Sequence, residues 1–366
     1  MSLNEYGLTR GERVVAGRTE ADIYKALGMD WIPPELREAH DEIALARSGR
    51  LPTLIALEDL RADLHMHSTR SDGTATLEQM VRAAKAAGYA YCAITEHSQA
   101  LAMARGFDEA RVRKSVGEIA AVRKAVPGIE VLHGLEVDIL GDGALDLADD
   151  ALALLDWVIV SLHSRLQMPR AEMTARVLRA LDHPRVSAMG HPTARRIGQR
   201  EPAELDLEAV FERAAERGVA MEINSQPDRT DLSDVNARLA ASKGVSFVID
   251  TDSHAVAQLE LIRYGVFSAR RAGLVKAQVL NTRPYPRFRE WLDRPRVAVS
   301  RAPSKQAPAT KPGRKFAPTE KPRTKSAPTT RPRAKSSPAA KPRAKSAPVT
   351  KSGSKPAGGG KAPRPR

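Results

Sequence analysis

Between about residue 59 and residue 290, short apolar runs alternate with longer amphipathic segments. The apolar runs have the composition of β-strands and cover residues 61–68, 89–97, 129–140, 156–164, 186–192, 219–226 and 245–254. The segments between them place apolar residues three and four positions apart, which predicts helices over 76–88, 108–126, 171–183, 205–218 and 232–244. Seven strand–helix units of this kind predict an α/β fold, built on a parallel sheet or on a closed barrel.

The ends of the predicted strands favour the barrel. Nearly every strand finishes in polar residues, as strands do at the catalytic face of barrel enzymes. We therefore expect a (β/α)7 barrel that gathers polar side chains at one rim.

The stretch "DLHMHSTRSDG" (residues 63–73) is the most unusual of these strand ends. Alternate side chains on a strand share a face, so we expect His65 and His67 to point the same way as Asp63. Leu64 and Met66 should then share the opposite face. Two imidazoles that project together can chelate a borderline metal ion, although two ordinary core or surface histidines would give the same pattern.

Composition divides the chain into three regions. Residues 1–58 form a small extension with a helical pattern at 19–28, followed by Pro33 and Pro34, which can open a second helix. Residues 59–290 carry the alternating pattern of the barrel. Residues 291–366 are rich in Lys, Pro and Ala and repeat every ten residues from about 299 onward. We predict that this basic tail (residues 291–366) is disordered, because such a composition cannot form a core.

The positive charge of the chain is concentrated in the basic tail. After residue 300 there are 19 Lys and Arg and one acid, Glu320, whereas residues 1–300 carry 39 basic and 43 acidic side chains. Evenly spaced cations on a flexible segment bind phosphate backbones without sequence preference, which makes DNA the expected partner. A solubilising segment, or one that binds RNA or membranes, would have a similar composition.

The cysteine content and the absence of long apolar runs indicate where in the cell the protein works. A single cysteine, Cys92, excludes an internal disulfide and a cysteine-based zinc cage. We see no secretory signal and no apolar run of about 18 residues. We therefore expect a cytoplasmic, nucleoid-associated protein with no membrane partner.

Potential metal ligands stand at or near the end of almost every predicted strand. They include six of the nine histidines of the chain, and the full set is His65, His67, Asp72, His97, Glu136, His163, His191, Asp252 and His254. We interpret the other three histidines, His40, His133 and His183, as structural. Glu96 and Asp250 flank ligands and are expected to be their hydrogen-bond partners.

This arrangement resembles the PHP (polymerase and histidinol phosphatase) family of metal-dependent phosphoesterases over about residues 59–290. The matching motifs are H-x-H at His65–His67 and D-x-H at Asp252–His254, with the single ligands between them. The resemblance implies a distorted seven-stranded barrel that holds three divalent metal ions. It implies one ion at His65, His67, Glu136 and Asp252, a second at Glu136, His163 and His191, and a third at Asp72, His97 and His254.

The implied chemistry is attack of metal-bound hydroxide on phosphorus, and the first of these sets contains the residues we expect to be catalytic, His65, His67, Glu136 and Asp252. Nitrogen and oxygen ligands together suit Zn²⁺, Mn²⁺ or Fe²⁺ and do not choose among them. Phosphate charge also needs cationic partners, for which Arg165, Arg195 and Arg229 are candidates. Asn224 is a candidate for orienting the substrate.

Residues 1–62 and the stretch "ELDLEAVFERAAERGVAMEIN" (204–224) are similar to bacterial family X DNA polymerases. There the segment before the PHP domain is the end of the polymerase thumb and a linker. The PHP domain of that subgroup is a Mn²⁺-dependent 3′→5′ exonuclease with 3′-phosphatase and abasic-site activities in DNA repair. The polymerase palm with its catalytic aspartates has no counterpart in the sequence, so we expect no polymerase activity.

The leading hypothesis is a metal-dependent phosphoesterase hydrolase that acts on DNA ends as a 3′→5′ exonuclease or 3′-phosphatase. DNA would be bound non-specifically by the basic tail and the rim of the site, and a separate DNA polymerase or ligase is a candidate partner. One alternative is a small-molecule phosphatase of the histidinol-phosphate type. Another is a nucleoid-associated DNA-binding protein with an inactive barrel.

Overall fold

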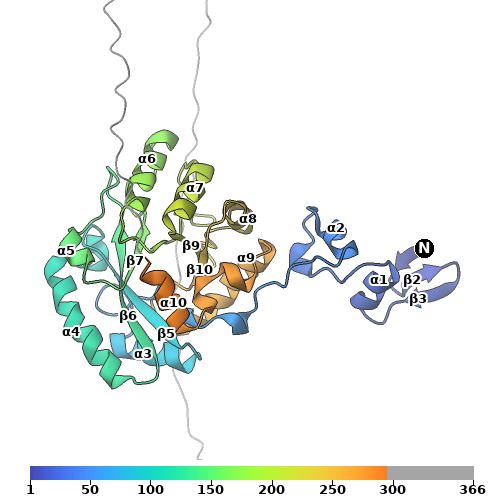
Figure 1. Cartoon of the computed structure of the whole chain (residues 1–366), viewed down its shortest axis with the longest axis horizontal. Coiled ribbons are helices and arrows are strands. Elements are labelled where there is room, and N and C mark those ends of the chain that lie inside the picture. The colour runs from blue at the N-terminus through green and yellow to red at the C-terminus, as the bar shows by residue number, and fades with distance from the viewer. Residues whose placement is uncertain (295–366) are drawn as a thin grey trace, which may run out of the picture. The chain divides into compact units, whose positions relative to one another are not determined.

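The computed structural model describes residues 1–294, and Figure 1 shows helices around a central sheet. All seven predicted strands are present. They are β4 (Ala62–Asp63), β5 (Tyr91–His97), β6 (Glu130–Asp138), β7 (Trp157–Ser161), β8 (Ala188–Met189), β9 (Ala220–Asn224) and β10 (Phe247–Asp250). All are parallel and pair in chain order in one sheet. The predicted α/β fold is confirmed. We predicted disorder and DNA binding for a basic tail that starts at residue 291. Trp291 and Leu292 belong instead to helix α10 (Tyr285–Leu292), and residues 295–366 lie outside the described part.

Helices stand at the five predicted positions along the sheet. These are α3 (Leu77–Ala86), α4 (Glu109–Ala125), α6 (Arg170–Leu181), α7 (Leu207–Arg217) and α8 (Asp234–Ser242). Local signals set their ends: Thr76 and Gln79 cap the start of α3 reciprocally, and Gly218 ends α7 in the left-handed region, at φ 63°. Further helices were not anticipated, namely α5 (Asp149–Leu152), α9 (Ile262–Arg271) and α10 (Tyr285–Leu292).

The sheet is nearly closed into a barrel where β4 meets β10. His67 N donates to Ser253 O at 2.8 Å, just past the ends of both strands. Carboxylates complete the seam, because Asp250 Oδ1 accepts from Leu64 N at 2.8 Å and Asp63 Oδ1 accepts from Thr251 N at 3.2 Å. The barrel is therefore distorted at this seam, where side chains replace part of the backbone ladder.

The seam corrects one expectation about the H-x-H stretch. Regular strand ends at Asp63, and the shared face predicted for Leu64 and Met66 does not hold, whereas His65 and His67 do point toward one carboxylate, that of Glu136. Leu64 packs inside the barrel, whereas Met66 packs in the layer between the sheet and the outer helices. The reason is that Asp63 Oδ1 also accepts from His65 N, which turns the chain away from a regular pleat.

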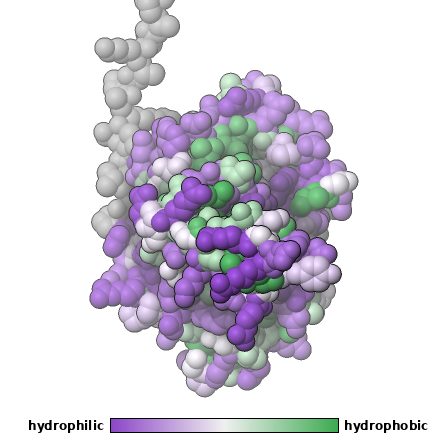
Figure 2. Space-filling view, turned by 90° about the vertical axis from the view of Figure 1, so that its right-hand side faces the viewer, coloured by the Kyte–Doolittle hydropathy of each residue, from purple (hydrophilic) through white to green (hydrophobic). Residues whose placement is uncertain are grey.

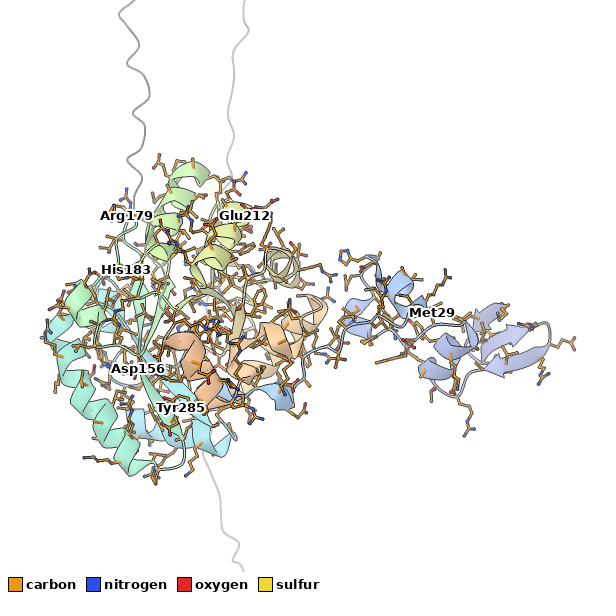
Figure 3. All side chains as sticks on the ribbon, in the orientation of Figure 1. Met29, Asp156, Arg179, His183, Glu212 and Tyr285 are labelled. Atoms are coloured by element: carbon orange, nitrogen blue, oxygen red, sulfur yellow. The ribbon has the colours of Figure 1, made fainter. Side chains whose placement is uncertain are left out.

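The amino ends of the strands enclose an apolar core that α10 covers. Phe288 and Trp291 of α10 pack there against Tyr91 and Trp157, the first residues of β5 and β7, with ring centroids 4.9–6.4 Å apart. Arg289 of the same helix pairs with Asp156 at 3.1 Å, near Tyr285 in Figure 3. This end of the barrel is thus filled, and polar groups are left to the carboxyl ends.

The extension before the barrel contains the predicted helix but also a sheet. Helix α1 (Glu20–Ala26) lies at the predicted position, and α2 (Glu42–Arg47) follows. The sheet was not anticipated, and its antiparallel strands are β1 (Ser2–Asn4), β2 (Gly7–Arg10) and β3 (Arg13–Ala16). Its strands are too short for a two-residue period to stand out from a polar loop.

Short 3₁₀ turns connect many of these elements. They are η1 (Pro34–Leu36), η2 (Leu57–Asp59), η3 (Ala102–Ala104), η4 (Val256–Leu261), η5 (Lys276–Gln278) and η6 (Leu280–Thr282). Glu35 of η1 pairs with Arg270 of α9 at 2.7 Å, which ties the end of the extension to the barrel. Figure 2 shows a mostly hydrophilic face with separate apolar patches. Within residues 1–294, no helix combines the length and apolar character that crossing a membrane requires.

Candidate metal centre

The nine predicted ligands converge at the carboxyl ends of the barrel strands. Their six imidazoles form one continuous cluster in which neighbouring ring centroids lie 4.2–6.0 Å apart. Two members sit where the chain leaves its strand in the left-handed region, Asp252 at φ 52° and His191 at φ 27°. Few non-glycine residues adopt such angles, and here they occur among groups whose side chains meet in the cluster.

The carboxylate of Glu136, on β6, is the centre of the cluster. Its Oε1 lies 2.8 Å from His191 Nε2 and 3.3 Å from His163 Nε2. Its Oε2 lies 2.8 Å from His97 Nδ1, 3.4 Å from His65 Nε2 and 3.6 Å from His67 Nε2. Burial alone would raise the pKa of Glu136, but the surrounding histidines hold that pKa well below its usual value.

Asp252 completes a four-residue group with Glu136 and the H-x-H pair. Its Oδ1 lies 3.2 Å from His67 Nε2 and 3.6 Å from His65 Nε2. Burial would raise the pKa of this carboxyl as well, yet the charge of His65 and the contact with His67 lower it. Two carboxylates that stay ionised among imidazoles supply the mixed oxygen and nitrogen donors that divalent transition metals favour.

A second group, around Asp72, faces the solvent. Asp72 Oδ2 lies 3.4 Å from His97 Nε2, and Oδ1 lies 3.3 Å from His254 Nε2. His67 stacks on the rings of both histidines, at 4.3 and 4.2 Å. The side chains of Asp72 and His254 are 35% and 31% exposed, whereas those of His65, His67 and Glu136 are fully buried.

Several atoms of the cluster are buried without a hydrogen-bond partner, which tests whether the site fits a metal. They include His65 Nε2, both ring nitrogens of His67, His97 Nδ1 and Glu136 Oε2. Unpaired buried polar atoms destabilise a fold, so their concentration at one point requires a ligand that satisfies them. The donors fall into three overlapping sets, and within each set all the donor atoms lie within 4.8 Å of one another. The donor set and its unpaired atoms fit divalent metal ions.

Two buried carboxylates that the sequence analysis missed orient the histidines. His65 Nδ1 donates to Glu222 Oε1 at 2.6 Å, and His163 Nδ1 donates to Asp138 Oδ1 at 3.1 Å. Each bond fixes the tautomer that leaves Nε2 free to face Glu136. The signal was present in the sequence, because Glu222 and Asp138 stand two positions from Asn224 and Glu136 and so share their face of the strand.

Glu96 and Asp250, which we expected to be hydrogen-bond partners of the ligands, instead bond to residues beside the ligands. Glu96 accepts hydrogen bonds from the hydroxyls of Ser68 and Ser71 and from Ser68 N, which fixes the loop that carries Asp72. Asp250 binds Leu64 N at the barrel seam. His133 points outward, and its Nε2 contacts Ser115 Oγ at 2.6 Å, as expected of a structural histidine.

A cavity of about 690 Å³ opens over the cluster, and it contains one of the predicted substrate-binding residues, Arg229. Arg229 Nε lies 3.5 Å from Asp252 Oδ2, and its buried Nη1 has no partner. The donors of Arg195 instead bind the backbone oxygens of residues 229 and 230, and Asn224 binds Glu222 and Asp252. Arg165 is not among the cavity-lining residues, which do include two arginines missed from sequence, Arg196 and Arg200.

Comparison with known proteins places this geometry in a family. Residues 63–226 match the PHP domain, and residues 1–38 match the DNA polymerase beta thumb. A protein of Acetivibrio thermocellus named "Probable phosphatase" is 30% identical over 201 residues, which cover 52% of this chain and 78% of that protein. The chain belongs to the PHP family. PHP-domain phosphoesterases are metal-dependent, in agreement with the donor set described above.

Two further likenesses extend the comparison. The "DNA polymerase/3'-5' exonuclease PolX" of Bacillus subtilis is 36% identical over 294 residues, 80% of this chain, so the chain spans about half (51%) of that relative's length. The histidinol phosphate phosphatase of Lactococcus lactis, solved with zinc, L-histidinol and phosphate, is 18% identical with a TM-score of 0.40. The structural match covers 57% of this chain and 93% of the Lactococcus chain. The structural likeness is too low to bear on substrate.

Proposed function

We propose that this PHP protein hydrolyses phosphoesters at DNA ends and removes 3′-terminal nucleotides or 3′-phosphates. The observation that carries the proposal is a sequence match that covers the extension as well as the barrel. PolX is similar to it over 294 residues, and the first 38 residues match a DNA polymerase thumb. A segment of that kind in front of a phosphoesterase barrel supports a nucleic-acid substrate more than a free metabolite.

We propose the division of the ligands that the family resemblance implies, with which the distances agree in part. The donors within 4.8 Å of one another also join His67 to the group of Asp72, and His97 to Glu136 and His163. His65, His67, Glu136 and Asp252 would hold one divalent ion, Glu136 with His163 and His191 a second, and Asp72 with His97 and His254 a third. Ions bound there lower the pKa of water and neutralise charge on a phosphoryl group. Because His67 also contacts the group around Asp72, and His97 the carboxylate of Glu136, the three sets form one continuous centre.

The protein's own side chains would bind and orient the phosphate. Arg229 Nη1 is buried and unpaired beside Asp252, so it can donate a hydrogen bond to a phosphoryl oxygen without first breaking another contact. Arg196 and Arg200 add positive charge to the cavity wall. Glu222 and Asp138 accept the Nδ1 protons of His65 and His163 and so aim the Nε2 atoms of these rings at the centre.

A direct assay tests the proposal. The purified protein, loaded with Mn²⁺ or Zn²⁺, is incubated with a 5′-labelled oligonucleotide, with a 3′-phosphorylated oligonucleotide and with histidinol phosphate. We expect shortening from the 3′ end or release of 3′-phosphate, and loss of both in the double variant His65→Ala/His67→Ala. His183→Ala is the matched control, because that histidine binds Asp149 outside the centre. Intact oligonucleotides in the presence of metal-loaded protein would refute the proposal.

A small-molecule phosphatase is the second candidate, favoured by the name of the Acetivibrio relative, and a nucleoid-associated binding protein without catalysis is the third. Removal of residues 299–366 separates the first two. Those residues hold the excess basic charge, so DNA processing should weaken steeply as salt is raised, whereas turnover of histidinol phosphate should not change. A protein that binds DNA but turns over neither substrate would support the third candidate.

A further inference from the structure

The lining of the cavity has two chemically different parts. One part contains three arginines, Arg196, Arg200 and Arg229, with Arg196 paired to Asp228 at 2.9 Å and Arg229 beside Asp252 at 3.5 Å. Another part is apolar and consists of Leu101 and Met103. Phosphate hydrolysis alone accounts for the arginines and the metal-binding cluster. It does not account for two apolar side chains at the same opening.

Met103 is the most exposed large apolar residue among those described, at 97%, and Leu101 is only half-buried. A single exposed apolar side chain needs no explanation on an ordinary surface. Met103 belongs instead to the lining of the cavity that contains His97 and Asp72. It lies where a bound substrate can cover it.

The loop that presents these two residues is anchored at both ends. Ala100 N donates to Asp146 Oδ2 at 2.5 Å, and Phe107 N donates to His97 O at 2.7 Å. Gly106 packs so closely on the backbone of Ser98 that a Cβ would not fit. The loop therefore holds Met103 in the open while its flanks are fixed, which reduces the entropy lost when a ligand binds.

We infer that Leu101 and Met103 contact the base of the terminal nucleotide, an inference that rests on the proposed function. A nucleotide joins an anionic phosphate to a flat aromatic ring, and the cavity offers a site for each within one volume of about 690 Å³. Methionine suits this contact because its polarizable sulfur packs favourably on aromatic rings of different shapes. Such a contact discriminates between nucleotide ends and small phosphomonoesters without reading sequence.

The test compares oligonucleotides that end in a normal nucleotide with ones that end in an abasic tetrahydrofuran residue. We expect Leu101→Ser/Met103→Ser to lower kcat/KM on the normal end on the order of 10-fold, because two apolar contacts to the base are lost. On the abasic end the same variant should match the wild type within about 2-fold, since the contacts it removes are absent there. Met103→Leu should retain most of the activity, because it keeps an apolar side chain.

Val235→Ser is the matched control, since Val235 is 70% exposed on α8 and is not part of the cavity lining. Melting curves of all variants check that the fold is unchanged. An equal loss on both ends, or no loss on either, would overturn the base contact and leave the proposed function standing. Failure of the wild type on both oligonucleotides would overturn the proposed function and the base contact with it.

Discussion

The two ends of the barrel use the same inward-facing strand positions for opposite purposes. On β5 the first residue, Tyr91, packs against α10, whereas the last, His97, joins the histidine cluster. The amino end satisfies its groups by apolar packing, and the carboxyl end leaves buried nitrogens and a carboxylate oxygen unpaired. The comparison teaches that one end supplies the stability that the other end gives up in order to bind ions.

The largest effect on activity is expected from Glu136→Gln. The substitution preserves the volume of the side chain but removes the charge that faces five histidines, so we expect kcat to fall on the order of 10³-fold or more. Bound metal, measured by elemental analysis, should fall as well. Full activity with undiminished metal content would show that Glu136 is not the centre of the site.

A change at the opposite end should affect stability and leave the chemistry intact. Phe288 is fully buried between Tyr91, Trp157 and Trp291, so Phe288→Ala should cost about 3–5 kcal/mol of unfolding free energy. Urea unfolding measures the loss. Activity per folded molecule should stay near that of the wild type, and a parallel loss of metal affinity would contradict the separation of the two ends.

Glu222→Gln should have an intermediate effect. The amide can still accept the bond from His65 Nδ1, but it cannot supply the charge that raises the pKa of His65. Loss of a partner of this kind weakens metal affinity or activity by about 10–100-fold. Metal titration followed by calorimetry measures the change, and Glu216→Gln, which alters an exposed carboxylate on α7, is the control.

The smallest effect is a pH dependence of the protein stripped of metal by a chelator. Burial alone would lower the pKa of His97, but Glu136 and Asp72 raise it to about 10, and Glu136 and Asp138 raise that of His163 to about 9. A histidine whose folded pKa is raised stabilises the fold fully below its unfolded pKa of about 6.5 and stops doing so as pH rises through the folded pKa. Stability should therefore decline between pH 7 and pH 10.

Melting curves in chelator at the two pH values measure this decline, which should be smaller in His97→Gln. Metal affinity should change in the opposite direction, because protons must leave the imidazoles before an ion binds, and so it should rise over the same interval. A wild type and a His97→Gln variant with the same pH dependence would contradict the assignment.

Sequence periodicity by itself determined the seven strands, the five helices between them and the end of the barrel at which the ligands stand. It could do so because side-chain direction on a strand or helix repeats with a fixed local period, and the carboxyl ends of parallel strands share one rim. The H-x-H and D-x-H pairs were visible as motifs, although both lie just past the regular ends of β4 and β10. The helix α10 and the sheet of the extension were missed because these elements are short, whereas α9 is as long and as amphipathic as α3 and was overlooked.

Only the tertiary structure decided which groups meet across the barrel. Glu222 reaches His65 over 157 positions of sequence, and the contact depends on how β10, the neighbour of β9, closes onto β4 through a seam of side-chain bonds. The placement of Arg196 and Arg200 in the cavity lining, while Arg195 binds backbone oxygens, was likewise invisible, because adjacent loop residues have no fixed direction. Local periods predict directions along an element, but distances between elements follow from packing the whole chain.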